Sequence, residues 1–128
     1  MNLLLDTHLL VWTATRPERL SARAREHLSD PGNSLFFSAV SIWEIGIKRR
    51  LERLDFQLDP ERLRDQLLAN AYREIDFTSR HGLAVQDLPL LHRDPFDRAL
   101  IAQARHEGLM LMTADHDIGL YQDAILKV

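Results

Sequence analysis

Four acidic residues occupy positions at which an α/β protein would bring them together. Asp6 directly follows the apolar run 2–5, and Asp115 follows a later apolar run. Glu44 and Asp97 lie on predicted helices, each in register with apolar residues that face inward. Four neighbouring carboxylates repel one another unless a cation neutralises them, and Mg²⁺ and Mn²⁺ prefer oxygen ligands. These residues therefore predict a metal site.

A metal site built from carboxylates suits phosphodiester hydrolysis. In two-metal sites one ion prepares the attacking water and the other stabilises the leaving oxygen. The formal net charge of −3 gives the protein no general attraction for a polyanion, so the metal would supply the local positive field. Basic residues close to the acids in sequence are the predicted contacts for an RNA or DNA backbone: Lys48, Arg49, Arg50 and Arg53, or Arg93 and Arg98. Alternatively, Lys48 belongs to a basic run that simply favours the dipole at a helix end.

The elements that must position these residues alternate along the chain. Strands are predicted at residues 2–5, 34–38, 73–77, 109–113 and 125–128. Helices are predicted at residues 8–15, 21–29, 39–54, 61–71, 79–86, 95–107 and 117–121. This order predicts an α/β fold with a mostly parallel sheet of four or five strands and helices on both faces. Ligands of such sheets bind beyond the carboxyl ends of the strands.

Composition limits the class of protein. The 128 residues make one domain, and 45% hydrophobic with 27% charged residues are typical of a globular protein. No apolar run approaches the ~20 residues that span a bilayer, and the N-terminus lacks the basic start of a signal peptide. The absence of cysteine fits a reducing compartment, so we expect a cytoplasmic protein with no membrane association.

Each acid also has a purely structural explanation. Asp6 is placed to cap the helix that follows it. Glu44 stands four residues before Lys48, which is the spacing of a helical ion pair. Asp94 is placed to cap the helix at 95–107, whose first turn contains Asp97 at a position that favours the helix dipole.

Other residues are expected to be structural. Asp115 can cap the last short helix, and Asp117 suits a purely structural role. The histidines show no pair with the spacing of a zinc site, and His8 and His116 are expected at the surface. The residues predicted to pack in the core are Trp12, Phe36, Phe37 and Trp43.

Four segments, in this order, resemble the PIN-domain ribonucleases. The opening Leu3–His8 is similar to the first acidic motif, and Ser41–Lys48 resembles the helix with one inward Glu. The most specific segment, Asp94–Ala104, is similar to the third-acid helix of the VapC-like toxin branch. Leu111–Asp117 resembles the fourth motif. The resemblance covers essentially the whole chain and implies a single PIN-like domain over residues 1–128.

The resemblance implies a metal-dependent endoribonuclease, the toxin of a toxin–antitoxin pair, which hydrolyses RNA with a metal-activated water. By position, the catalytic and metal-binding acids would be Asp6, Glu44, Asp97 and Asp115, and the ion Mg²⁺ or Mn²⁺. Thr7 and Thr113 would support the acids through hydroxyl hydrogen bonds. Asp94 and Asp117 are further acids beside the third and fourth motifs, so both could share the ligand role.

The resemblance also implies partners. Family members commonly form homodimers, and an antitoxin tail covers the groove and often places a basic side chain among the acids. Two other functions stay open for this chain. One is a metal-dependent phosphatase of small substrates, although an aspartyl-phosphate route would want a second Asp at the position of His8. The other is a non-catalytic PIN-like binding or regulatory module, against which the four intact acids argue.

Overall fold

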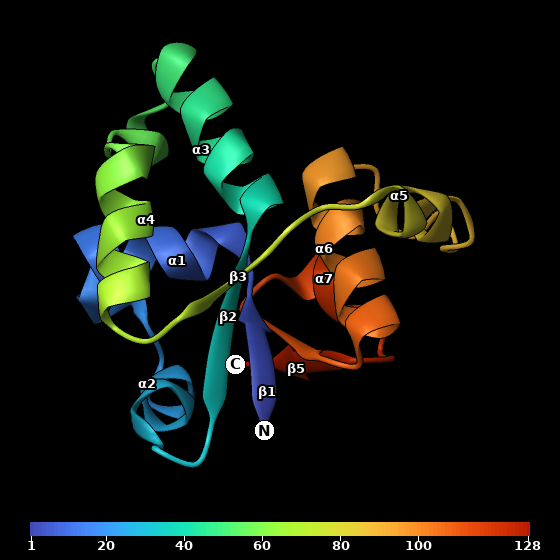
Figure 1. Cartoon of the computed structure of the whole chain (residues 1–128), viewed down its shortest axis with the longest axis horizontal. Coiled ribbons are helices and arrows are strands. Elements are labelled where there is room, and N and C mark those ends of the chain that lie inside the picture. Colours follow the sequence, from blue (N-terminus) through green and yellow to red (C-terminus); the bar gives the residue numbers. More distant parts are fainter.

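Five short apolar segments pair into one parallel sheet. The computed structural model describes residues 1–128. Its strands are β1 (Asn2–Leu5), β2 (Ser34–Ser38), β3 (Arg73–Ile75), β4 (Met110–Thr113) and β5 (Ile125–Lys127). They lie in the order β3-β2-β1-β4-β5, and every neighbouring pair is parallel. The prediction of a parallel α/β sheet is thus confirmed, with β1 at its centre (Figure 1).

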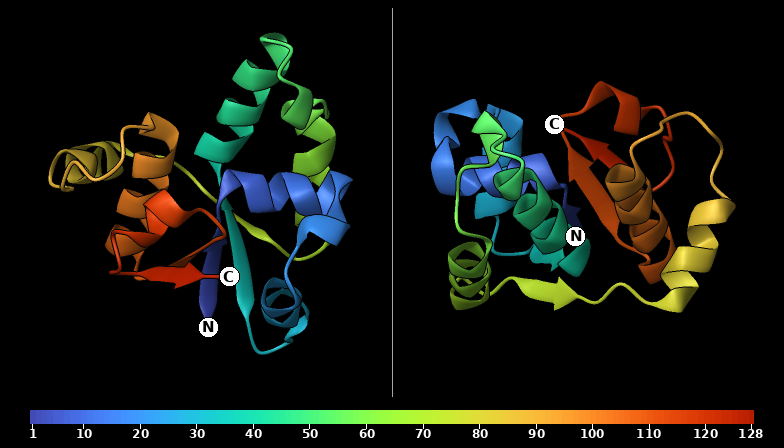
Figure 2. Two further views of the ribbon diagram at one scale, coloured as in Figure 1. Left: turned by 180° about the vertical axis from the view of Figure 1, so that it is seen from behind. Right: turned by 90° about the horizontal axis from the view of Figure 1, so that it is seen from above.

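Helices cover both faces of this sheet, as predicted (Figures 1 and 2). They are α1 (Thr7–Thr15), α2 (Ala22–Ser29), α3 (Ala39–Arg50), α4 (Pro60–Ala69), α5 (Ser79–Gln86), α6 (Pro95–Glu107) and α7 (His116–Gly119). One face carries α1, α2 and α4, and the other carries α5 and α6. None of the helices combines the length and the apolar character that crossing a bilayer requires.

The sheet buries a separate apolar cluster on each face. Leu3 and Leu5 of β1 belong to the cluster under α1, α2 and α4, whereas Leu4 belongs to the cluster under α5 and α6. Met112 and Leu111 of β4 divide in the same way, because successive side chains of a strand point to opposite faces. The central strands therefore consist of apolar residues throughout, and polar residues appear only where those strands end.

Helix α3 differs from its prediction. It ends at Arg50 rather than continuing to Leu54, because the chain turns at Glu52, which has a left-handed φ of 59°. The expectation that Trp43 packs in the core is wrong, since this side chain is 62% exposed. Figure 1 shows the reason: α3 rises away from the sheet edge, so little of its surface meets the sheet. The residues that α3 buries are Val40, Ser41, Glu44 and Ile45.

Candidate active site

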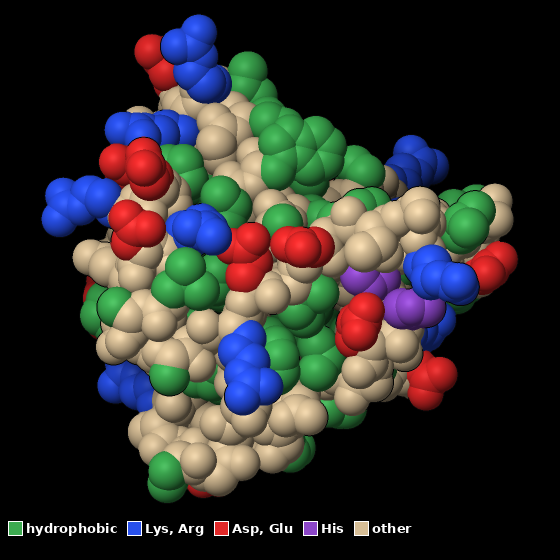
Figure 3. Space-filling model, viewed as in Figure 1, with side chains coloured by type: hydrophobic (Ala, Val, Ile, Leu, Met, Phe, Trp, Pro, Cys, Tyr) green, Lys and Arg blue, Asp and Glu red, His purple; other side chains and the backbone are tan.

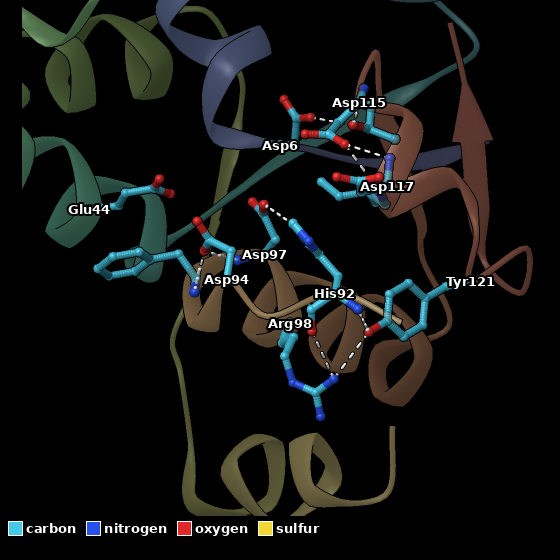
Figure 4. Close-up of polar contacts among 12 residues, drawn as sticks. Asp6, Glu44, His92, Asp94, Asp97, Arg98, Asp115, Asp117 and Tyr121 are labelled. Atoms are coloured by element: carbon cyan, nitrogen blue, oxygen red, sulfur yellow. Dashed lines mark hydrogen bonds and ion pairs between the residues drawn. The ribbon is translucent and has the colours of Figure 1, made fainter. Parts of the chain in front are cut away.

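The four predicted acids come from four separate parts of the chain and lie near the carboxyl ends of the central strands (Figure 4). Asp6 and Asp115 follow β1 and β4, neighbouring strands between which the strand order reverses. This is the switch point at which parallel sheets bind their ligands. Glu44 reaches the same space from α3, and Asp97 reaches it from the first turn of α6.

Asp6 is a buried carboxylate that is held at both oxygens. Its Oδ1 accepts a hydrogen bond from the backbone N–H of Leu9 at 2.8 Å and so caps α1. Its Oδ2 accepts a hydrogen bond from the hydroxyl of Thr113 on β4. Burial raises the pKa of Asp6, and the charge of Asp115 adds to this increase. The predicted capping role is therefore present, and it fixes the carboxylate at the end of β1.

Glu44 has one oxygen with a partner and one without. The side chain is buried, and its Oε2 lies 2.5 Å from Nζ of Lys48, so the predicted ion pair exists. The same ammonium stands 4.8 Å from the ring centroid of Phe56. The other carboxylate oxygen, Oε1, is buried without any hydrogen-bond partner. A buried acceptor left in this way costs about 1–3 kcal/mol or more, so this atom suits an additional cation.

Asp97 carries an electrostatic cost that a cation would remove. Burial raises its pKa to about 6, and the negative charges of Asp94, Glu44 and Asp6 add to the increase. The hydrogen bond from His92, whose Nε2 lies 2.7 Å from Oδ2, acts in the opposite direction. A free aspartate ionises near 3.8, so this carboxylate is poised to exchange a proton for a metal ion.

The two further acids differ in their roles. Asp94 caps α6, because its Oδ1 accepts hydrogen bonds from the backbone N–H groups of Phe96 at 2.8 Å and Asp97 at 3.0 Å. Asp115 also caps, since its Oδ1 accepts from the backbone N–H of Asp117 at 2.7 Å. The side chain of Asp117 is exposed in the first turn of α7. Since the potential ligand atoms of Asp97 and Asp115 lie within 4.8 Å of each other in a group that contains neither Asp94 nor Asp117, Asp97 and Asp115 are the better candidates for ligands.

The two threonines do different things. The Thr113 hydroxyl donates to Asp6 and accepts the backbone N–H of Asp115 at 3.0 Å, so it links the two acids at the strand ends. The prediction that Thr7 supports an acid in the same way is wrong. Its hydroxyl pairs with that of Ser41 at 2.9 Å, because its side chain faces α3. Thr7 therefore ties the start of α1 to the helix that carries Glu44.

The prediction that Arg98 contacts substrate is also wrong. Its side chain is buried on the side of α6 away from the acids (Figure 4). Nη1 donates to the Pro89 carbonyl at 3.0 Å and to the Tyr121 hydroxyl at 3.0 Å. Nη2 donates to the carbonyls of Val85 at 3.2 Å and Leu88 at 3.4 Å. Since consecutive helical residues are about 100° apart, Asp97 faces the site while Arg98 secures the loop before α6.

Sequence reasoning missed His92. Because this residue lies in an irregular loop, no periodicity indicated where its side chain points. In the structure its ring nitrogen joins Asp97 and Asp115, with all three potential ligand atoms within 4.8 Å of one another. Only the contact with Asp97 in three dimensions identifies it.

A second histidine group, His81 with His106 and Glu107, lies between α5 and α6. Nδ1 of His81 accepts the backbone N–H of Thr78 at 3.0 Å as part of the cap of α5. Its Nε2 must therefore carry the proton, which it donates to Glu107 at 2.7 Å. A metal would need the lone pair of that nitrogen, so the group is better explained as a helix cap.

An apolar groove of about 650 Å³ lies between α3, α5 and α6. Figure 3 shows hydrophobic side chains gathered on this part of the surface. The exposed ring of Trp43 meets Phe96 edge-on, with the ring centroids 5.1 Å apart. Trp43 and Phe96 directly precede Glu44 and Asp97 in sequence, and the acid that lines the groove itself is Asp76. Exposed apolar surface of this kind marks a site of protein association.

The raised pKa of Asp97 predicts a pH-dependent effect of metal on stability. Between about pH 4 and pH 6 the folded protein keeps a proton that the unfolded chain has lost, so stability from this group falls as the pH rises. Above about pH 6 the carboxylate is ionised and free to bind a cation. We therefore expect Mn²⁺ to raise the melting temperature at about pH 8 and much less at about pH 5. Thermal denaturation with and without Mn²⁺ measures this, and equal increases at both pH values would contradict it.

Comparison with known proteins identifies the family of the chain. The PIN domain family matches residues 3–123. Ribonuclease VapC22 of Mycobacterium tuberculosis (strain ATCC 25618 / H37Rv) is 30% identical over 115 residues, which are 89% of this chain and 87% of that protein.

Two solved structures share the fold. VapBC2 from Rickettsia felis, bound to a DNA fragment from its promoter, has a TM-score of 0.71 at 17% identity and covers 100% of this chain and 98% of its own. Mycobacterium tuberculosis VapC20, a toxin that cleaves the sarcin–ricin loop, has a TM-score of 0.60 at 15% identity and covers 92% and 93%. With four acids gathered at the switch point and a family match over nearly its whole length, the chain belongs to the PIN-domain family, among the VapC-like ribonucleases.

Proposed function

We propose that this protein is a metal-dependent endoribonuclease and the toxin of a toxin–antitoxin pair. The observation that carries the proposal is the partnerless, buried oxygen of Glu44 within a group of four carboxylates. A partly buried cluster of like charge with an unused acceptor fits a divalent cation better than any structural role. The ribonuclease name of the VapC22 relative supports RNA as the substrate. A cytoplasmic location stays a prediction from the cysteine-free composition.

In this proposal Asp6, Glu44, Asp97 and Asp115 hold Mg²⁺ or Mn²⁺. When bound, the ion supplies an activated water and neutralises charge on the phosphodiester. Asp6 is the fixed reference point of the site because Leu9 and Thr113 hold its two oxygens. Without metal, the carboxylates repel the phosphate backbone, so RNA binds productively only to the loaded protein.

Lys48 is the proposed contact for the RNA backbone. Its ammonium already lies at the site, 2.5 Å from Glu44. A metal ion held by the free Oε1 of Glu44 would weaken the attraction between Glu44 and Lys48, and the ammonium would then be available to bind a phosphate oxygen as a point charge. Replacing Lys48 with methionine should raise KM for RNA more than it lowers kcat, which steady-state cleavage rates can measure.

The proposed activity is tested on a mixed RNA pool that includes transfer RNA. Purified protein is incubated with Mg²⁺, with Mn²⁺ or with a chelator. We expect cleavage in the first two reactions and none in the third. Equal cleavage in chelator would refute the metal-dependent site. If the protein binds metal and hydrolyses only small phosphate esters, it is a phosphatase; if it binds metal and hydrolyses nothing, it is a binding module.

The partner in this proposal is an antitoxin whose apolar segment lies in the groove beside Trp43. The groove is lined by Asp76 and by Trp43 and Phe96, the neighbours in sequence of Glu44 and Asp97, so a basic side chain next to that segment would meet complementary charge. Solved relatives described as toxin–antitoxin complexes support this kind of partner. A small DNA-binding protein encoded by an adjacent reading frame would be the molecule to test.

Loss of the Trp43 ring should weaken antitoxin binding. An exposed tryptophan in an apolar groove has the properties of a hot spot, so Trp43→Ala should raise Kd about 30-fold. Leu54→Ala is the matched control, because Leu54 is 90% exposed and lies outside the groove. Calorimetry with the purified partner measures the Kd of both variants.

Light scattering of the same samples tests the predicted homodimer. If Trp43→Ala changes only the oligomeric state and not the Kd for the partner, the groove is the interface with a second copy of this chain instead.

A further inference from the structure

The imidazole of His92 lies inside the acid group. Its Nε2 is 2.7 Å from Oδ2 of Asp97, and the ligand atoms of His92, Asp97 and Asp115 all lie within 4.8 Å of one another. Figure 4 shows the ring pointing from the loop before α6 toward Asp97. The side chain is only 16% exposed. These three atoms are spaced closely enough to contact a single ion.

Buried groups hold the backbone of His92 in place. Its N–H donates to the Tyr121 hydroxyl at 3.0 Å, and its carbonyl accepts from Nη1 of Arg98 at 3.4 Å. The Tyr121 hydroxyl also donates to the carbonyl of Pro89 at 2.9 Å. A histidine that merely faced solvent would need no such support. The Arg98–Tyr121 pair instead presents the imidazole at a defined position, as the groups behind a metal ligand do.

The protonation pattern of His92 permits metal binding. In the metal-free protein Nε2 donates to the Asp97 carboxylate, and no backbone group binds Nδ1. The proton can therefore reside on Nδ1 when Nε2 offers its lone pair to a cation. His81 lacks this freedom, since its Nδ1 accepts a backbone hydrogen bond. Of the two histidine groups, only the one at the acids fits a metal.

We propose that His92 is a nitrogen ligand of the metal site, sharing one ion with Asp97 and Asp115. This inference rests on the proposed function, because it requires that the acids bind a divalent cation. A neutral imidazole suits first-row transition metals, whereas Mg²⁺ favours oxygen ligands and retains water. The protein therefore binds Mn²⁺ more tightly than Mg²⁺, and His92 produces that preference.

The test is electron paramagnetic resonance of Mn²⁺ bound to the full-length protein. Directly coordinated imidazole nitrogen produces a nitrogen hyperfine coupling, which changes when histidine is labelled with nitrogen-15. We expect this coupling in the wild type, its loss in His92→Gln and its retention in His116→Gln. His116 is the matched control because it follows Asp115 directly and is exposed. The affinity of His92→Gln for Mn²⁺ should fall at least about 10- to 100-fold, which is the loss expected when even a group that hydrogen-bonds a metal ligand is removed.

The possible results separate this inference from the proposed function. Failure of the wild type to bind Mn²⁺ would overturn the metal site and both proposals with it. Binding of Mn²⁺ without nitrogen coupling would overturn only the role of His92, which would then be a hydrogen-bond partner of Asp97. Coupling that persists in His92→Gln would assign the nitrogen to another residue and also overturn the inference. An absence of nitrogen coupling in the wild type overturns the inference even if His92→Gln does not fold.

Discussion

The Asp97→Asn variant should cleave RNA at least about 10²- to 10³-fold more slowly than the wild type, while remaining fully folded. The amide removes a metal-ligating charge, and loss of one preorganised electrostatic group has an effect of this size. Because burial and like charges raise the pKa of Asp97 to about 6, the ionised carboxylate at neutral pH lowers the stability of the metal-free protein. Removing it should therefore leave the free energy of unfolding unchanged or raise it. Single-turnover cleavage and urea denaturation measure the two effects.

Asp94→Asn is the matched control for this experiment. Asn caps a helix about as well as Asp, so α6 should keep its start. Asp94 is committed to that cap in the structure, and we expect the variant to retain most of its cleavage activity. If Asp94→Asn were inactive and Asp97→Asn active, the third ligand would have to be moved to Asp94.

The Arg98→Met variant should lose about 3–5 kcal/mol of stability, with a melting temperature lower by at least about 10 °C. The guanidinium donates to backbone carbonyls of the 85–92 segment and to the Tyr121 hydroxyl, all beside a buried interface. Methionine fills similar space but donates to none of them, so those acceptors stay buried without partners. Thermal denaturation in the absence of metal measures the loss directly.

Arg93→Met provides the comparison, because Arg93 is exposed in the same loop. We expect its stability to stay within about 0.5 kcal/mol of the wild type. Unchanged stability of Arg98→Met together with weaker RNA binding would restore the substrate role that the sequence suggested for Arg98.

Much of the fold is predictable because local signals agree with the final packing. The strand 34–38 and the helix 95–107 have the bounds that the sequence predicts. The helix has clear signals at both ends: Asp94 and a proline open it, and Gly108 closes it with a left-handed φ of 69°. The four acids could be located because two follow apolar strands and two lie on inward helix faces.

The errors concern side chains whose direction depends on distant parts of the chain. Trp43 is apolar, yet α3 leaves the sheet and exposes it beside Phe96. Arg98 is charged, yet the loop before α6 and Tyr121 enclose it. His92 has no periodic neighbours at all. The local sequence pattern predicts which residues prefer burial, but only tertiary contacts determine which helix and loop surfaces are covered by the rest of the protein.

The central position of β1 also determines when the site can form during synthesis. Asp6 is bonded to Thr113, which lies 107 residues further along the chain. At translation rates of roughly 5–20 residues per second, about 5–20 s separate the two. During that interval the nascent chain lacks Asp115, and β1 lacks one of its two neighbouring strands. The acid group at the end of β1 can therefore be completed only after β4 has been made.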